Sequence, residues 1–367
     1  MKKFAALLPF ALPTQVLFAQ IIVGDTLTPE QLVQELFVGQ QITASNVWFN
    51  YAPGSFANDQ IGSFDGTNTG LNMASGIIMA TGGVHVALGP NDLPNAELAP
   101  SNPQIGDPDI GAIAGPGITP YDVALLELDL IPAGDSIWFR FLFASEEYPE
   151  YVCGSYNDAF GLFLSGLGIS GPYTNEAVNL ALVPGTSIPI TINTVNPGVP
   201  GAPGLEGNCA ALDPNWVENS VYYVANTDSA QIQFDGWTTV FTVSAVVVPN
   251  ETYHIKIELA DASDTHWDSA LFLEAGSLNG SAPTAVADGN ARPRCTLRVD
   301  ATNDLLWIDG ELQDHADLTV IDPTGRMVLR ERLTGQPVSI AKLGTGPYVA
   351  RVQHADGVVT VARFVCE

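Results

Sequence analysis

Short apolar or alternating runs recur along the chain between residues 42 and 274, and clusters of Gly, Pro and Asn separate them. Runs rich in Val, Ile, Phe and Trp are typical of strands, and the residues between them are typical of turns. The pattern predicts strands at 42–49, 76–81, 124–130, 136–144, 159–164, 188–194, 237–247, 252–260 and 269–274. Because almost no helix separates these strands, we expect antiparallel pairing in a large β-sandwich or jelly-roll-like domain.

One helix is predicted near the N-terminus, at residues 28–37. Thr28 can cap this helix, Pro29 suits its first turn, and apolar residues recur on one face. Two long segments, 89–119 and 196–207, are polar and rich in Pro or Gly, and they show no periodic pattern. We therefore expect both segments to be surface loops.

The pattern changes beyond the last of these strands. Residues 280–294 have the composition of a linker, and residues 295–367 give about seven short strands. Hairpin turns are expected at 322–325 and 355–357. The prediction is thus all-β throughout, with a large domain at 20–279 and a small Ig-like β-sandwich at 295–367.

The first residues are typical of a secretory signal peptide. Lys2 and Lys3 precede a short apolar run at 4–18, and the small residue Ala19 follows it. We expect a signal peptide at 1–19. No later run is long and apolar enough to cross a bilayer, so the predicted mature chain has no transmembrane span. It is expected to be secreted or attached to the outer-membrane surface after export.

Charge is distributed unevenly between the two predicted domains. Residues 20–283 hold 29 Asp and Glu but only two basic side chains, Arg140 and Lys256. Residues 284–367 hold 9 Lys and Arg and 11 Asp and Glu. A surface as acidic as that of the first part repels phosphate, which makes nucleic acid an improbable partner. The acidity fits either solubility or the binding of divalent cations.

Four cysteines lie in the chain, two in each part that the charge defines. An even number of cysteines in an exported chain indicates disulfides. We predict the pairs Cys153–Cys209 and Cys295–Cys366, because the other pairings would cross the domain boundary. No two cysteines have the spacing of a zinc site.

Two acidic segments are candidates for calcium binding. Calcium takes six to eight oxygen ligands, among them carboxylates, Asn side chains and backbone carbonyls. The candidate ligands are Glu146, Glu147, Asn157 and Asp158 in the first segment and Asp261, Asp264 and Asp268 in the second. The two segments are able to form one site. The alternative is structural, with these acids capping turns and accepting backbone amide hydrogen bonds.

Three classes of function remain open from the residues alone. The leading hypothesis is a non-catalytic binding or adhesion module whose ligand is a glycan or a surface protein, with Trp267 as the candidate for an exposed ligand surface. The second is a carbohydrate-active hydrolase that uses the acidic loops, since such enzymes need two carboxyl groups. The third is a structural component of an extracellular matrix or envelope. No Gly-x-Ser-x-Gly nucleophile motif is present.

Several motifs that occur in order resemble those of the choice-of-anchor L domain of exported bacterial surface proteins. They are Phe-Ala-Ser-Glu-Glu-Tyr-Pro-Glu-Tyr-Val at 143–152, Tyr-Asn-Asp-Ala-Phe-Gly at 156–161, Leu-Ala-Leu-Val-Pro-Gly-Thr at 180–186, Asp-Gly-Trp-Thr-Thr at 235–239, Leu-Ala-Asp-Ala-Ser-Asp at 259–264 and Asp-Ser-Ala-Leu-Phe-Leu-Glu at 268–274. The resemblance covers roughly residues 28–278 and implies a surface or secreted protein.

The C-terminal part resembles the type IX secretion sorting domain of Bacteroidetes-type bacteria. The segment Val-Ile-Asp-Pro-Thr-Gly-Arg-Met-Val at 320–328 is similar to a hairpin of that family, and 340–352 is similar to its following strand. The usual Pro-Asn-Pro opening is absent, and the chain ends in Phe-Val-Cys-Glu instead of a basic tail. The resemblance implies that the secretion and sorting machinery is a partner of this domain.

Overall fold

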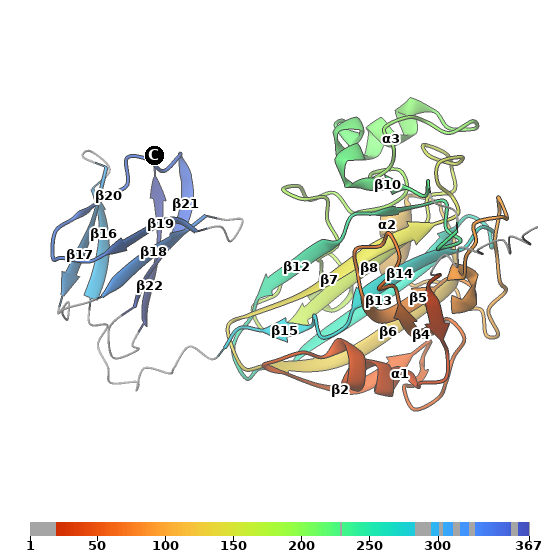
Figure 1. Ribbon diagram of the computed structural model, residues 1–367, viewed down its shortest axis with the longest axis horizontal. Helices are drawn as coiled ribbons and strands as arrows, with labels where there is room; N and C mark the ends of the chain where they lie inside the picture. Colours follow the sequence, from red (N-terminus) through yellow and green to blue (C-terminus); the bar gives the residue numbers. More distant parts are fainter. Residues whose placement is uncertain are drawn as a thin grey trace, which may run out of the picture. The chain divides into compact units, whose positions relative to one another are not determined.

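The computed structural model describes residues 20–227, 230–282, 295–300, 304–310, 316–322, 327–353 and 359–366. The predicted signal peptide at 1–19 lies outside this part of the chain. The chain divides into two compact units, the first ending at Ala282 and the second beginning at Pro283 (Figure 1). Sheets of antiparallel strands build both units, which confirms the all-β prediction.

The first unit is made of two sheets. The nine-stranded sheet has the order β1-β4-β5-β14-β7-β11-β10, and β12 and β15 also pair with β7. Its strands are β1 (Ile22–Gly24), β4 (Ile61–Asp65), β5 (Ser75–Ala80), β7 (Ser136–Ser145), β10 (Tyr223–Ala225), β11 (Gly236–Thr238), β12 (Phe241–Val246), β14 (Ser269–Glu274) and β15 (Asn279–Gly280). The six-stranded sheet has the order β3-β2-β6-β13-β8-β9. Its strands are β2 (Ile42–Phe49), β3 (Ala52–Pro53), β6 (Pro120–Pro132), β8 (Ala159–Gly166), β9 (Val178–Asn179) and β13 (Tyr253–Ala262).

The main core of the first unit lies between these two sheets. Inward residues of β7 and β14 share one buried cluster with inward residues of β6, β8 and β13. Phe143 of β7 stacks on Phe160 of β8 at 5.1 Å between ring centroids. The alternation of side chains along each strand produces this arrangement, because every second residue faces the opposite sheet. The fold is therefore the predicted β-sandwich.

The predicted N-terminal helix is present and packs against this core. It consists of α1 (Pro29–Gln31) and a π-helical continuation, η1 (Leu32–Phe37). Thr28 and the side chain of Gln31 form a capping box at its start, as a cap at Thr28 predicts. Phe37 is fully buried, and its ring centroid lies 5.5 Å from that of Phe139.

The two segments predicted as loops are largely irregular, and each of them meets one short helix. The first contains α2 (Pro108–Ala114), capped by the side chain of Asp107, and the second leads into α3 (Glu206–Leu212). In Figure 1, α3 lies beside β10. The remaining helices are η2 (Val84–Ala87), η3 (Thr174–Glu176) and η4 (Trp216–Tyr222). Both missed helices are only seven residues long, too short for a clear apolar period.

Two strand predictions need correction. Residues 188–194 form turns with isolated bridges, because side chains there replace a strand ladder: Thr191 N–H donates to Thr194 Oγ1, and Cys153 N–H donates to Asn193 Oδ1. The run at 237–247 is divided between β11 and β12, which both pair with β7.

The second unit has two small sheets around its own core. Their orders are β16-β17-β20 and β19-β18-β21-β22. The strands are β16 (Cys295–Asp300), β17 (Leu305–Gly310), β18 (Asp317–Ile321), β19 (Met327–Arg332), β20 (Val338–Ser339), β21 (Gly346–Gln353) and β22 (Val359–Cys366). The seven predicted strands are thus found, in a small sandwich. The hairpin turn predicted at 355–357 lies outside the described residues, and so does the turn predicted at 322–325 except for its first residue.

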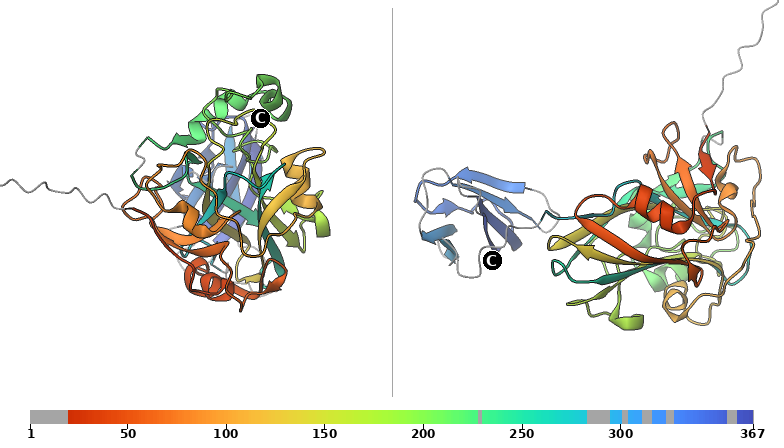
Figure 2. Two further views of the ribbon diagram at one scale, coloured as in Figure 1. Left: turned by 90° about the vertical axis from the view of Figure 1, so that its right-hand side faces the viewer. Right: turned by 90° about the horizontal axis from the view of Figure 1, so that it is seen from below.

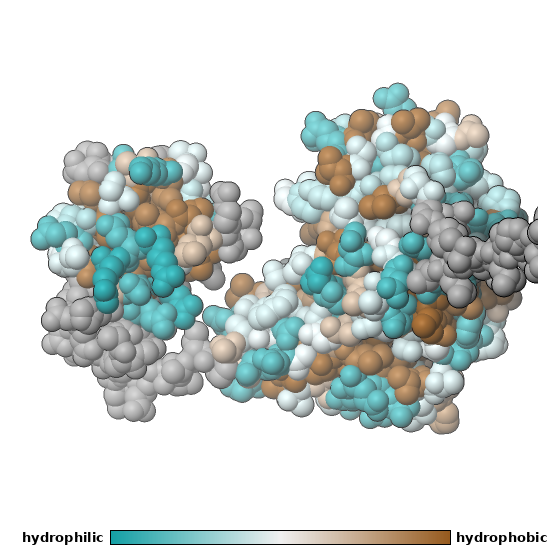
Figure 3. Space-filling view, in the orientation of Figure 1, coloured by the Kyte–Doolittle hydropathy of each residue, from teal (hydrophilic) through white to brown (hydrophobic). Residues whose placement is uncertain are grey.

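The surface of the first unit carries both hydrophobic and polar residues (Figure 3). The face shown in Figure 3 carries hydrophobic residues in small groups between polar ones. Two of the most exposed apolar side chains, Leu205 and Val221, lie next to α3 and in η4. The views in Figure 2 show α3 lying outside the strands of this unit.

Candidate functional site at one end of the first sandwich

Two loops connect the sheets at the same end of the first unit. One runs from β7 to β8, and the other runs from β13 to β14. Ser145 at the end of β7 pairs with Ser269 at the start of β14, and Ala159 at the start of β8 pairs with Ala260 near the end of β13. Pairing in both sheets therefore brings the two predicted acidic segments together.

The strand period places two of the acids at the end of the core. Asp261 follows Ile257 and Leu259 on the inward face of β13, and Asp158 precedes the inward Phe160 by two residues. Asp261 is 0% exposed and Asp158 is 1% exposed. Carboxyl groups thus occupy positions that the alternation reserves for apolar side chains.

Asp158 joins the two loops by hydrogen bonds. Its Oδ1 accepts from the backbone N–H of Ala262 at 2.9 Å, and its Oδ2 accepts from Ser269 Oγ at 2.6 Å. Burial raises the pKa of Asp158 to about 7, although both hydrogen bonds favour its ionised form. This carboxyl is therefore held in place from both sides.

Asp261 and Glu147 are buried without any such partner. Both are 0% exposed, and neither oxygen of either carboxyl has a hydrogen-bond partner. Burial, together with the charges of Asp158 and Asp268, raises the pKa of Asp261 well above its usual value. Burial and the charge of Asp158 raise the pKa of Glu147 to about 11. Unpaired buried carboxyls are costly and call for an explanation.

Glu146 and Asp268 hold a third segment against the two loops. Glu146 Oε2 accepts from Ala96 N–H at 3.2 Å, and Asp268 Oδ2 accepts from Leu98 N–H at 2.8 Å. Burial raises the pKa of Glu146 to about 9 and that of Asp268 to about 8. A Cβ at Gly82 would lie 2.1 Å from Asp268 Oδ2, so this carboxyl fits only against glycine.

The other two predicted ligands lie beside this group. Asn157 is buried, and it is engaged with its surroundings: Nδ2 donates to Ala114 O at 3.2 Å, and Oδ1 accepts from Asn193 N–H at 2.9 Å. Asp264 is partly exposed and accepts from His266 N–H at 3.1 Å. These two therefore match the structural alternative, in which polar side chains stabilise the loops.

No Arg or Lys side chain in the described part of this unit is available to the buried acids. Between residues 20 and 283 the chain has only Arg140 and Lys256. Arg140 is bound to Glu274 at 2.5 Å, and Lys256 contacts Asp107 and lies 2.6 Å from Asp109. Among the described residues, His, Cys, Asp and Glu side chains alone form no set of three that could hold a metal ion.

Three aromatic rings lie together in the same two loops. Tyr151 and Tyr156 come from the first loop and Trp267 from the second, and all three are partly exposed. The rings of Tyr151 and Trp267 are 4.5 Å apart and tilted by 30°, and that of Tyr156 meets Tyr151 edge-on at 5.5 Å. We call these three residues the aromatic cluster. Trp267 is the predicted ligand-surface residue, and the spacing of aromatic residues in the sequence does not show that Tyr151 and Tyr156 lie beside it.

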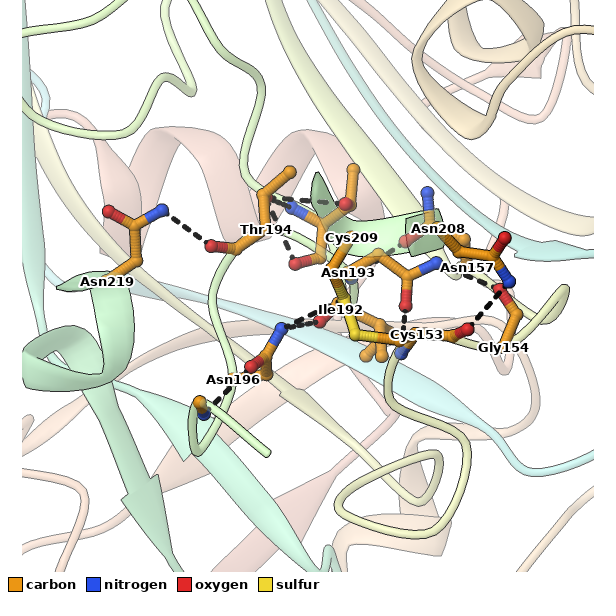
Figure 4. The surroundings of a disulfide bond; sticks show 12 residues. Cys153, Gly154, Asn157, Ile192, Asn193, Thr194, Asn196, Asn208, Cys209 and Asn219 are labelled. Carbon is orange, nitrogen blue, oxygen red and sulfur yellow. Dashed lines mark hydrogen bonds between the residues drawn. A yellow bond between two sulfur atoms is a disulfide. The ribbon is translucent and has the colours of Figure 1, made fainter. Parts of the chain in front are cut away.

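The predicted disulfide Cys153–Cys209 is confirmed and holds the first loop. It joins this loop to α3 across a sequence separation of 56 residues. Leu205 N–H and Asn208 Nδ2 both donate to Cys153 O, at 3.0 and 2.8 Å, and Asn193 Nδ2 donates to Gly154 O at 3.0 Å (Figure 4). The base of the aromatic cluster is thus covalently fixed.

The second predicted disulfide, Cys295–Cys366, is not formed in the structure. Cys366 is a free cysteine. Cys295 begins β16 in one sheet of the second unit and Cys366 ends β22 in the other, and the side chain of Cys295 lies outside the described residues.

Residues 20–279 match the family model of the Choice-of-anchor L domain. The chain belongs to the Choice-of-anchor L domain family. Membership of this family indicates a surface-associated or extracellular protein. No helix in the described part of this Choice-of-anchor L protein is long and apolar enough to span a membrane.

Other known proteins add little to the family match. No curated protein matches the chain. Among solved structures, it is similar to a β-glucuronidase of Ruminococcus gnavus, with 7% identity over 66% of this chain and 34% of that chain and a TM-score of 0.16. The same enzyme in complex with uronic isofagomine gives 7% identity, 66% and 35% coverage and a TM-score of 0.15. The Choice-of-anchor L chain spans about a third of that enzyme's length, and likeness at this level carries no argument about activity.

Proposed function

We propose that the first unit is a non-catalytic binding or adhesion module and that it binds a glycan at the aromatic cluster. The observation that carries this proposal is the contact between the partly exposed rings of Tyr151 and Trp267. Tyr and Trp combine an apolar ring with a polar tip, which is why they are enriched in recognition surfaces. A sugar offers C–H groups to such rings and hydroxyl groups to nearby carboxylates, such as that of Asp264.

The cluster is prearranged, which favours binding. Trp267 has a φ of 58°, a conformation that a bulky residue adopts only where its surroundings hold it. The disulfide at Cys153 fixes the loop that carries the two tyrosines. Rings that are ordered before the ligand arrives lose little conformational entropy when it binds.

The burial of the paired acids supports binding over hydrolysis. A glycosidase needs two carboxyl groups that reach the sugar from opposite sides of the scissile bond. Glu146 is 2% exposed and Glu147 is 0% exposed, so neither reaches a sugar outside the protein surface. The raised pKa of Glu146 thus follows from its burial next to the core, and no role in acid catalysis is needed to account for it.

Replacement of Trp267 is expected to abolish most of the glycan binding. We expect Trp267→Ala to weaken binding at least 10-fold, because central aromatic residues carry much of the energy of an interface. The measurement is a glycan array with the full exported chain, followed by titration calorimetry with the best glycan. Trp48→Ala is the matched control, since Trp48 is 44% exposed on β2 and lies outside the two loops. Equal losses in both variants would contradict the site, and an array without hits would favour a structural role in an envelope or matrix.

We also propose that the second unit is a type IX sorting domain, recognised by the secretion and sorting machinery. Its small sandwich and the motif at 320–328 support this proposal. Deletion of residues 284–367 is expected to retain the first unit in the periplasm, and cell fractionation with an antibody against the first unit measures this. The full chain, expressed in parallel, is the control. Surface delivery of the truncated chain at the level of the full chain would refute the assignment.

A further inference from the structure

Four carboxyl groups are buried together where the two sheets end. Glu147, Asp158 and Asp261 are between 0% and 1% exposed, and Asp268 is 3% exposed. Asp158 accepts from Ala262 N–H, next to Asp261, and from Ser269 Oγ, next to Asp268, and the backbone N–H of Glu146 donates to Asp268 O at 3.1 Å. Carboxyl groups that are buried close together cannot all be ionised unless a positive charge lies among them.

The described residues of the first unit supply no such charge. Arg140 and Lys256, the two Arg and Lys residues between 20 and 283, are bound elsewhere. His266, the nearest histidine in sequence, is exposed, and its Nδ1 lies 2.7 Å from Glu97 Oε2. The group must therefore be neutralised either by protons or by a cation from solution.

Hydrogen bonding distinguishes these two possibilities. A protonated carboxyl has an O–H that needs an acceptor, and buried polar groups are nearly always satisfied. Both oxygens of Glu147 have no partner in the protein, and those of Asp261 accept from no donor and lie beside the carboxyl of Asp158 and the hydroxyl of Thr81. Asp158 and Asp268, in contrast, accept from groups that hold them in place. Oriented acceptors next to unpartnered carboxylate oxygens are the arrangement expected around a metal ion.

We propose that a divalent cation, calcium in the extracellular setting, binds between the two sheets at the end of the core, with Asp158 and Asp261 as its central ligands and Glu147 and Asp268 beside them. An all-oxygen set suits a hard cation and not zinc or copper. Since side chains of His, Cys, Asp and Glu alone complete no set of three, backbone carbonyls, hydroxyl groups and water fill the other positions. Glu146, Asn157 and Asp264 are not ligands in this proposal.

The position of the ion gives it a structural role. Asp158 immediately precedes β8 of one sheet, and Asp268 immediately precedes β14 of the other. Asp261 is the last residue but one of β13, so the bound ion joins both sheets and both loops that carry the aromatic cluster. The proposal concerns the stability of the fold and stands independently of the glycan, because its measurement needs no ligand other than the ion.

The test uses the full chain, freed of metal by chelator and dialysis. Titration calorimetry with calcium chloride and melting curves with calcium, with magnesium and with chelator are recorded at pH 7.5. We expect calcium to bind with a measurable heat and to raise the melting temperature by at least 5 °C. Asp261→Asn should weaken calcium binding at least 10-fold, while its melting temperature in chelator equals or exceeds that of the wild type, because a buried charge is removed.

Two further variants keep the test decisive. Glu147→Gln should show the same loss if Asp261→Asn fails to fold, and Asp92→Asn, at an exposed position, should respond to calcium like the wild type. A wild-type chain that gives no heat and melts at the same temperature in calcium and chelator would overturn the proposal. So would a folded Asp261→Asn chain with an undiminished calcium response. Equal stabilisation by magnesium would overturn the preference for calcium.

Discussion

Removal of the Cys153–Cys209 bond is expected to lower the free energy of unfolding of the first unit by about 4 kcal/mol. In the chain-entropy model, a bond that closes a loop of this size restricts the unfolded chain by that amount. Both sulfurs are fully buried, and Cys153 O also accepts two hydrogen bonds from the α3 segment. Loss of the bond therefore releases the first loop as well as α3.

Urea unfolding of the double variant Cys153→Ala/Cys209→Ala measures this effect. The matched control is Cys366→Ala in the second unit, which removes a free thiol and should change the unfolding of the first unit by less than about 0.5 kcal/mol. Dithiothreitol should destabilise the wild type and leave the double variant unchanged. A double variant within about 1 kcal/mol of the wild type would show that the loop is held by its hydrogen bonds alone.

The stability of the first unit is expected to fall as the pH rises from 5.5 to 9, in large part because of Glu258. This carboxyl is 0% exposed, one of its oxygens has no hydrogen-bond partner, and its Oε2 lies 3.6 Å from Lys256 Nζ. Burial and the charge of Asp107 raise its pKa to about 8, against a usual value of 4.5, and Lys256 offsets only part of the shift. A raised pKa in the folded state means that stability is present below pH 4.5 and is lost as the pH passes through 8.

Glu258→Gln should flatten this pH dependence. Gln keeps the shape of the protonated carboxyl and cannot ionise, so the variant should become more stable than the wild type by about 2–4 kcal/mol between pH 5.5 and pH 9. Urea unfolding at several pH values, with calcium at one saturating concentration, measures the difference. The exposed Glu251→Gln is the control. Parallel curves for wild type and Glu258→Gln would mean that Lys256 keeps the carboxylate ionised throughout.

Much of the fold could be predicted from the period of apolar residues. The strands 42–49 and 269–274 coincide with β2 and β14, and the capped helix begins where Thr28 indicates. The strand predicted at 188–194 is wrong for a physical reason. Its apolar residues are buried as in a strand, but a side chain of the same segment accepts the backbone N–H that a neighbouring strand would otherwise bind. An apolar run therefore indicates that a segment is buried, but it does not show that the segment forms hydrogen bonds with a neighbouring strand.

The candidate site was predictable only in part. That Asp158 and Asp261 are core-facing follows from their positions two residues from Phe160 and Leu259, and this signal is visible in the sequence. That Glu146 faces Ala96, while Glu147 remains unpartnered, depends on a loop that the sequence pattern does not describe. The pairing of Lys256 with Asp107 and Asp109 was not predicted either, because it joins segments almost 150 residues apart.

The buried disulfide has a consequence for when this protein matures. The bond cannot persist in a reducing cytoplasm, so a newly made chain lacks the corresponding part of its stability until it reaches an oxidising compartment. A less stable chain is easier to keep unfolded, and an unfolded chain is the form that threads through a narrow translocation channel. Oxidation of Cys153 and Cys209 after export then completes the end of the sandwich that carries the aromatic cluster, so this end is finished only outside the cytoplasm.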